Sequence, residues 1–232
     1  MLQLKFDHSR RVAFEAREIA VDLGWNEPDT LMAEIIGLLH DVGRFSQYQE
    51  FRTYFDPKSV NHGCRGFQVL SNSDWLAGLS SAENHLILES VRLHNRHQLP
   101  EDMSADLRRF VHLVRDADKL DIFFVLNRAI EEETLKDNPE IIWNLPRDIP
   151  PSQAILDDLQ NCRQARYENV KSQADFCLLQ LCWIYDLNYV STIRKVADRE
   201  VVDQIASALP FRDGLEEAIQ HLKQFMQKAV LA

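Results

Sequence analysis

The sequence predicts an all-α fold, and three observations support this prediction. Apolar residues recur at steps of three and four along much of the chain, as in Val12, Ala16 and Ile19, which is the period of one helix face. No segment sustains the alternation of apolar and polar residues that marks a half-buried strand. The 232 residues include only 7 Gly and 8 Pro, too few for the many tight turns of a β-sandwich or barrel.

The amino-terminal half is expected to contain a series of helices. The apolar face of the first reaches Leu23, and Gly24 follows where a helix would end. Pro28, in NEPD, lies near the first turn of the second helix, whose apolar stripe runs to Leu39. An aromatic-rich surface loop or lid that bears a short helix is expected at residues 45–63. The helical pattern then resumes at residues 64–70, 83–93 and 105–127.

The carboxy-terminal part begins with a segment whose periodicity is broken. Residues 132–151 contain Pro139, Pro146, Pro150 and Pro151 and are expected to form a long excursion or a soft boundary. Three helical stretches are predicted after it, at residues 153–185, 190–208 and 211–230. The chain shows no internal repeat and no low-complexity tract.

Composition and charge restrict the class of protein. A formal net charge of −10 disfavours generic nucleic-acid binding, because a phosphate backbone would be repelled. A small anionic ligand stays compatible, since a metal ion or a local arginine can reverse the field within a pocket. The four cysteines form no Cys-x-x-Cys pair, which predicts reduced thiols in a cytoplasmic protein. MLQLKFDHSRR lacks a signal-peptide core, and the most apolar run, residues 176–185, is too short to span a membrane.

Histidines and aspartates gather at the predicted ends of helices. The set comprises His8, His40, Asp41, His62, His94, His97, Asp116, Asp118 and Asp121. Imidazole nitrogen and carboxylate oxygen together suit a divalent ion such as Mn, Fe, Zn or Ni. The residues alone do not distinguish among the three later aspartates. A structural role is expected for His85, His112 and His221.

The spacing of the candidate ligands sets conditions on their geometry. Adjacent helical residues point about 100° apart, so His40 and Asp41 share one target only if the helix loosens there. Gly43, just beyond, permits such fraying. Asp41 has two oxygens and could therefore reach one metal ion beside His40 and a second beyond it. Asp118 and Asp121 lie one helical turn apart, and both could face the site.

Three segments form an ordered pattern: His8, then His40-Asp41 within LLHDVGRF, then Asp118 within RDADKLD. This pattern resembles the HD superfamily of metal-dependent phosphohydrolases. The resemblance implies an all-helical, HD-domain-like bundle with additional C-terminal helices. It also implies a first metal ion with four ligands, His8, His40, Asp41 and Asp118.

Further roles follow from the same resemblance. His62 and His94 match positions that hold a second ion in some family members, with Asp41 as the bridge between the two ions. The family pattern selects Asp118, and the preferred interpretation of Asp121, independent of the resemblance, is that it orients a ligand histidine or pairs with a nearby cation. The ion or ions could be Mn, Fe, Ni, Co, Zn or Mg, because such ligands follow metal availability as much as preference.

The resemblance extends from His8 to about Arg128. We therefore expect an HD-domain core with the metal site at residues 1–130. The helices of residues 131–232 are expected to complete or flank the same compact domain. The segment LHNRHQLP lacks the paired histidines and the Gly-Tyr-Pro signature of the branch that cleaves cyclic dinucleotides, and His97 there is either a supporting or a surface residue.

The reaction implied by the resemblance is hydrolysis of a phosphate ester. Bound metal would lower the pKa of a water, and the resulting hydroxide would attack phosphorus in line. Asp41 and Arg44 are the predicted catalytic residues, with Arg44 as a clamp on phosphate oxygens. Lys119, Arg65 and Arg96 are weaker candidates for a basic rim, and surface salt bridges are the preferred interpretation of Lys119 and Arg65.

The expected partner is a small phosphorylated substrate, a class that includes nucleotides. A nucleobase could stack on Tyr48, Phe51, Tyr54 or Phe55, although packing against the core is the preferred interpretation of these rings. The chain is expected to be a monomer or a homodimer that binds neither membranes nor nucleic acid generically. Three alternatives remain: a non-catalytic metal- or nucleotide-binding sensor, a di-iron oxygenase-type relative, and a structural helical protein.

Overall fold

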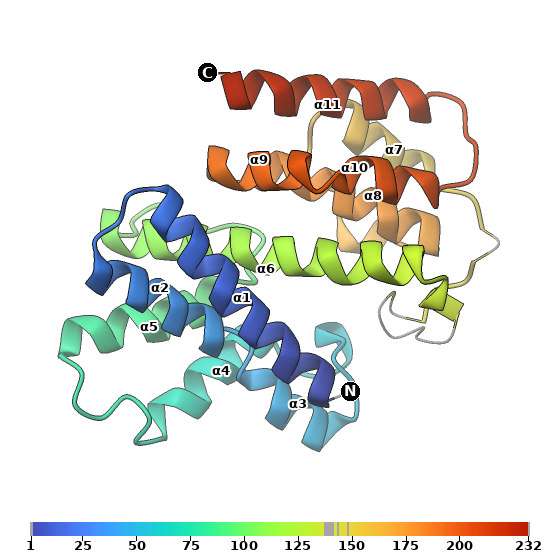
Figure 1. Ribbon diagram of the computed structural model, residues 1–232. Helices are drawn as coiled ribbons and strands as arrows, with labels where there is room; N and C mark the ends of the chain where they lie inside the picture. The colour runs from blue at the N-terminus through green and yellow to red at the C-terminus, as the bar shows by residue number, and fades with distance from the viewer. Residues whose placement is uncertain (1, 137–141, 143, 148, 232) are drawn as a thin grey trace. The chain divides into compact units, whose positions relative to one another are not determined.

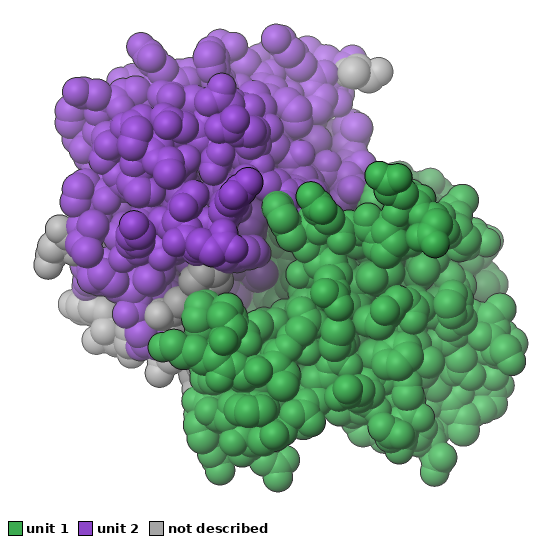
Figure 2. All heavy atoms as spheres, turned by 180° about the vertical axis from the view of Figure 1, so that it is seen from behind, with its two compact units in different colours: residues 1–121 green, residues 122–232 purple. Residues whose placement is uncertain are grey.

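The computed structural model describes residues 2–136, 142, 144–147 and 149–231. These residues form helices and connecting segments without any strand, which confirms the predicted all-α class (Figure 1). The chain divides into two compact units, Met1–Asp121 and Ile122–Ala232 (Figure 2). The boundary between them falls inside the long helix α6 (Ala105–Glu131).

The first unit contains five complete helices and the first part of α6. They are α1 (Leu2–Asp22), α2 (Glu27–Leu39), α3 (Gly43–Phe51), α4 (His62–Ser71) and α5 (Ser81–Leu93), with a short 3₁₀ helix η1 (Asp56–Lys58). α1 packs against α2, α3 against α4, and α4 against α5 (Figure 1). The core consists of buried apolar side chains that include Val12, Ala16, Ile19, Ile36, Ile87 and Val91. The apolar stripes seen in the sequence therefore face this core.

Local signals in the sequence set the ends of these helices. Gly24 has a φ of +69° and follows the end of α1, as predicted. The side chain of Asn26 caps α2 by accepting a hydrogen bond from the Asp29 backbone N–H (2.9 Å). Asn61 caps α4 in the same way, through the N–H of Cys64 (2.8 Å). The ends of α1, α2 and α4 thus lie at residues suited to those positions.

The segment after the His-Asp pair is more regular than the sequence predicts. Residues 43–51 form the nine-residue helix α3, and only residues 52–61 are irregular around η1. The buried residues of α3 are Gly43 and Gln47, so no apolar stripe marks this helix in the sequence. Arg52 adopts the left-handed conformation (φ 55°) and ends it.

The second unit contains shorter helices than the sequence predicts. After α6 come α7 (Gln153–Gln160), α8 (Gln173–Trp183), α9 (Val190–Asp198), α10 (Val201–Ser207) and α11 (Leu215–Leu231), with 3₁₀ turns η4 (Tyr167–Asn169) and η5 (Ile184–Asp186). α7 packs against α8 and α11, and α9 packs against α10 and α11. The core of this unit includes Leu156, Leu178, Leu181, Val196 and Leu222.

Two of the predicted helical stretches in this unit are interrupted. The stretch 153–185 breaks where Cys162 takes a positive φ of 54°, and α8 restarts after the cap Ser172. The stretch 190–208 breaks at Glu200, whose φ is 51°. The residues at both breaks are exposed, and the nearest buried apolar side chains are Leu159 and Ala165 around the first break and Val196 and Val201 around the second.

The proline-rich segment 132–151 contains one described 3₁₀ helix, η2 (Thr134–Lys136), and no α-helix among its described residues. Pro139 lies outside the described residues. The four cysteines are free thiols, with Cys177 and Cys182 buried and Cys162 exposed. No helix of the described part of the chain has both the length and the hydropathy needed to cross a bilayer.

Candidate metal centre

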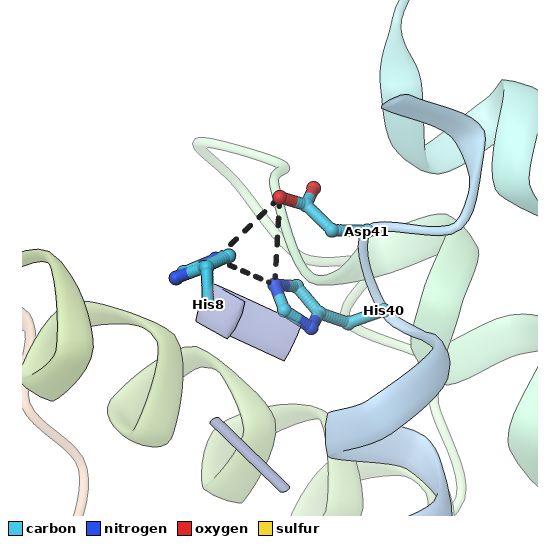
Figure 3. A group of neighbouring side chains, drawn as sticks. All are labelled: His8, His40 and Asp41. Carbon is cyan, nitrogen blue, oxygen red and sulfur yellow. Dashed lines mark hydrogen bonds and ion pairs between the residues drawn. The ribbon is translucent and has the colours of Figure 1, made fainter. Parts of the chain in front are cut away.

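Six side chains converge in the first unit from five separate segments of the chain. They are the predicted ligands His8, His40, Asp41, His62, His94 and Asp118. All are buried except Asp118, which is partly exposed. Subsets of three place their ligand atoms within 4.8 Å of one another. Figure 3 shows His8, from α1, facing His40 and Asp41 at the end of α2.

A turn after α2 lets both residues of the His-Asp pair face the cluster. α2 ends at Leu39, and the N–H of Val42 donates to the Leu39 carbonyl (3.0 Å). The helix therefore ends before the His-Asp pair, as expected, and Gly43 is the first residue of α3. A Cβ on Gly43 would overlap the His62 carbonyl oxygen and the Gly66 nitrogen. Its role is therefore the close approach of this turn to α4.

Backbone carbonyls orient two of the four histidines. His40 Nδ1 donates to the Gly37 carbonyl (2.7 Å), and His94 Nδ1 donates to the Val91 carbonyl (2.8 Å). Both histidines follow directly after a helix, and both acceptors lie three residues earlier. A carbonyl only accepts, so the proton is on Nδ1 in each ring, and the neutral ring has a lone pair on Nε2.

Carboxylates orient the other two histidines. His8 Nδ1 lies 2.6 Å from Asp121 Oδ2, and His62 Nδ1 lies 2.7 Å from Asp56 Oδ2. The four Nε2 atoms consequently point inward, where His8 faces His40 (3.2 Å) and His62 faces His94 (3.1 Å). We call these the first pair, His8 and His40, and the second pair, His62 and His94.

Asp41 directs one oxygen toward each pair. Its Oδ2 lies 3.5 Å from His8 Nε2 and 3.8 Å from His40 Nε2. Its Oδ1 lies 3.4 Å from His62 Nε2 and 3.9 Å from His94 Nε2. Asp118 Oδ1 adds a second carboxylate to the first pair, at 3.2 Å from His8 and 3.6 Å from His40.

The chemistry of this donor set fits a divalent cation. Imidazole lone pairs and carboxylate oxygens are all acceptors, so their convergence at 3–4 Å is unfavourable unless a proton or a cation lies among them. Imidazole nitrogens whose other ring nitrogen donates to a carbonyl or a carboxylate are the usual form of a metal-ligating histidine. The residues present could hold one ion at each pair, with Asp41 shared.

The carboxylates of the cluster are paired with positive charges of the protein. Burial opposes ionisation of Asp41, but Lys5, His40 and Arg44 hold the pKa of its carboxyl well below the usual range. Burial and Lys5 disfavour the charged form of His8, yet hydrogen bonds to Asp118, Asp121 and Asp41 raise its pKa to about 10. The carboxylates around the first pair therefore favour a positive charge on or beside its rings.

The second pair differs from the first in its protonation. Burial, together with the neighbouring His62 and His40, lowers the pKa of His94 to about 3. Burial and Arg44 likewise lower the pKa of His62, against the effect of Asp56. Both rings of the second pair are therefore neutral near pH 7, the form in which imidazole binds metal.

The structure adds two residues that sequence reasoning missed. Lys5 Nζ lies 2.9 Å from Asp41 Oδ2, one helical turn before His8 on α1. Asp56 accepts hydrogen bonds from His62 Nδ1 and from the side chain of Gln47 (2.9 Å). Lys5 lies three residues before His8, which places both on one face of α1, and this spacing could have indicated Lys5. No pattern in the sequence indicates Asp56, because the short 3₁₀ helix η1 that it begins has no periodic signal.

The predicted phosphate clamp, Arg44, is held by acceptors of the protein itself. Its Nη1 donates to the Tyr54 carbonyl (2.5 Å) and to Asp56 Oδ1 (2.8 Å), and its Nε lies 3.3 Å from Asp41 Oδ1. Arg44 therefore lies beside the cluster, and its contact with a phosphate stays a prediction. Asp121 orients His8 and pairs with the Arg11 guanidinium, the arrangement expected for it.

The remaining candidates lie away from the ligand atoms or have other partners. Arg65 forms a salt bridge with Glu50, as preferred for it, and Arg96 Nη2 lies 3.2 Å from Cys64 Sγ. His97 is exposed, and Asp116 is buried. The rings of Tyr48 and Tyr54 stack on each other at 4.9 Å, while Phe51 and Phe55 are partly exposed.

Residues 6–122 match the family model for the HD domain, which is half of the chain. The chain belongs to the HD domain family. The matched range ends beside the boundary of the first unit, so the cluster lies within the HD domain. HD domains are generally metal-dependent hydrolases, and the buried histidines and aspartates of this one could hold a metal ion. Comparison with curated proteins and with solved structures gives no match.

Proposed function

We propose that this HD domain is a metal-dependent phosphohydrolase that acts on a nucleotide or another small phosphate ester. One observation carries the proposal: Asp41 directs its two oxygens to two separate pairs of histidines. A carboxylate shared in this way is suited to bridge two cations, and two-cation sites that act on phosphate esters are a recurrent solution in enzymes.

The ligand roles follow from the distances. The first pair, with Asp118 and Asp41 Oδ2, would hold one divalent ion, and the second pair, with Asp41 Oδ1, would hold the other. When bound, such ions supply Lewis acidity, which makes water nucleophilic near neutral pH and offsets charge on phosphate oxygens.

The other side chains prepare the site for this chemistry. Asp121 and Asp56 hold the Nδ1 protons of His8 and His62, which keeps both Nε2 lone pairs directed inward. Burial of the ligands keeps competing water away and strengthens each electrostatic interaction. Arg44 lies beside Asp41, where its guanidinium could contact phosphate oxygens of a bound substrate.

The proposal is tested by loading the purified protein with Mn, Co, Ni, Zn or Mg and assaying nucleotides and model phosphate esters. We expect metal-dependent release of phosphate, and near-zero metal content and activity in Asp41→Asn. The exposed Asp74→Asn is the matched control and should behave as wild type. Stoichiometric metal without turnover of any ester would contradict the proposal and favour a sensor. Turnover that requires dioxygen after iron loading would favour an oxygenase.

A further inference from the structure

Lys5 is a cation placed against the shared ligand of the cluster. Its Nζ lies 2.9 Å from Asp41 Oδ2, the oxygen that faces the first pair. Lys5 lies on α1 one turn before His8, so the same helix supplies a ligand and a positive charge to one side of the site. Nothing in the ligand pattern of the cluster requires a lysine at this position.

Lys5 and Asp118 are the more exposed side chains at the first pair. The side chains of His40 and His94 are fully buried, and that of Asp41 is 3% exposed. By contrast, the side chains of Lys5 and Asp118 are 20% and 22% exposed. A ligand that approaches the cluster from solvent therefore meets Lys5 and Asp118 before it meets the histidines.

A divalent ion and the Lys5 ammonium compete for the same oxygen. An ion held by the first pair would use Asp41 Oδ2, and a second cation within a few ångströms would be repelled. Lysine has a flexible four-carbon stem, so its ammonium can move while the stem stays packed. An incoming phosphate offers the anionic oxygens that a displaced ammonium needs.

We propose that Lys5 binds the substrate and exchanges partners: it neutralises Asp41 while the first pair lacks an ion, and it binds a phosphate oxygen once the ion is in place. This inference rests on the proposed phosphohydrolase function, which it deepens by naming a residue that recognises the anionic group. Arg44 is less free to exchange, because its Nη1 already donates to Asp56 and to the Tyr54 carbonyl.

The surroundings of Lys5 support this exchange. Its Nζ lies 5.8 Å from the centre of the Tyr54 ring, which attracts a cation without fixing its direction. Among the described residues, the buried hydroxyl of Tyr54 makes no hydrogen bond. Within the same part of the chain, Asp41 is the only hydrogen-bond partner of Lys5 Nζ, so moving the ammonium away from Asp41 breaks a single hydrogen bond.

The inference is tested with Lys5→Gln and Lys5→Arg, with the exposed Lys58→Gln as the matched control. Calorimetry measures two dissociation constants. The first is for Mn²⁺ binding to the metal-free protein, and the second is for inorganic phosphate binding to the Mn²⁺-loaded protein. Lys5→Gln should bind Mn²⁺ roughly tenfold more tightly, because the competing charge is gone. It should bind phosphate roughly tenfold more weakly, since one charge-assisted hydrogen bond is lost.

The two effects have opposite signs, which a merely structural role would not produce. Lys5→Arg keeps the charge and should restore most of the phosphate affinity, while Lys58→Gln should resemble wild type in both constants. Weaker Mn²⁺ binding in Lys5→Gln would overturn the inference, because it would show that Lys5 only holds Asp41 in place. Unchanged phosphate affinity in Lys5→Gln would overturn it as well. A thermal melt of each variant confirms folding.

Neither measurement requires turnover, so the outcomes for Lys5 and for the hydrolase proposal are separable. If wild type hydrolyses no ester while the two constants shift as expected, the proposed function fails and the phosphate-binding role of Lys5 is supported. If wild type is active and the constants do not shift, the inference fails alone. In an active enzyme, Lys5→Gln should raise KM about tenfold, with a smaller effect on kcat.

Discussion

The two histidine pairs of the cluster are built alike but are charged differently. Each pair has one ring held by a backbone carbonyl and one held by a carboxylate. The first pair has two inward-facing carboxylates within ion-pair distance of its Nε2 atoms, Asp41 and Asp118. Among the described residues, the second pair has Asp41 alone as an inward-facing carboxylate at that distance. The same local geometry therefore carries about one more negative charge at the first pair.

Because of this difference, the two pairs should differ in their affinity for a divalent ion, although each offers two histidine Nε2 atoms. Carboxylates contribute both ligand oxygens and charge, so the first pair should bind a divalent ion more tightly than the second. Since the second pair depends on Asp41 and on the loop residue Asp56, its ion should be the one lost first under chelation.

The sharpest test of this comparison replaces one histidine in each pair. His40→Gln should remove both ions, because the first ion fixes Asp41 for the second, and activity should fall by about 10³-fold or more. His94→Gln should keep one ion per chain. Elemental analysis and phosphatase assays measure both quantities. Equal metal content in the two variants would contradict the expectation that the first pair binds its ion more tightly than the second.

The next test concerns the contact that brings the pairs together. Gly43→Ala should lower the free energy of unfolding by about 3 kcal/mol, because the new Cβ would overlap the backbone of α4 at His62 and Gly66. Gln49→Ala, at an exposed position of the same helix, is the control and should change it by less than about 0.5 kcal/mol. Denaturant titration measures both. An unchanged free energy of unfolding in Gly43→Ala would mean that α3 can move away from α4 without loss of stability.

A smaller effect is expected from the support of the second pair. Asp56→Asn should lower the affinity for the ion at the second pair by about 10- to 100-fold and leave the affinity at the first pair nearly unchanged. The reason is that Asp56 holds His62 but contacts neither residue of the first pair. Asp121→Asn is the counterpart and should weaken the first ion. Competition with a coloured chelator resolves the two sites. A loss of both ions in Asp56→Asn would show that the two pairs do not bind their ions independently.

The pH dependence gives the finest distinction. The pKa of His8 is raised from 6.5 to about 10, so in the metal-free protein its proton stabilises the fold fully below pH 6.5, and this contribution is lost as the pH rises toward 10. Between these values an ion at the first pair must displace that proton. His94, with its pKa lowered to about 3, is already neutral.

Binding of the first Mn²⁺ at pH 8 should therefore release one proton, and binding of the second should release none. Calorimetry in two buffers of different ionisation enthalpy counts these protons. Proton release that accompanies the second ion instead would reverse the assignment of the charged ring.

Particular residues show how far sequence reasoning reaches in this chain. The end of α1 just before Gly24 follows from the printed sequence, and the set of six proposed ligands follows from the sequence with the stated resemblance. A short helix was predicted in the segment 45–63, but the bounds of α3 were not, because α3 buries Gly43 and Gln47 rather than an apolar stripe. The breaks at Cys162 and Glu200 were missed because a positive φ in a residue other than glycine leaves no compositional signal.

The sequence by itself determined the helical class and the order of the candidate ligands, because apolar periodicity and a His-Asp pair are local properties of the chain. Only the tertiary structure decided which aspartate faces which histidine, since His8 and Asp121 lie 113 positions apart in the sequence. It also decided the partners of Lys5 and Asp56. Those contacts depend on how closely helices approach one another, and no short segment of sequence encodes that distance.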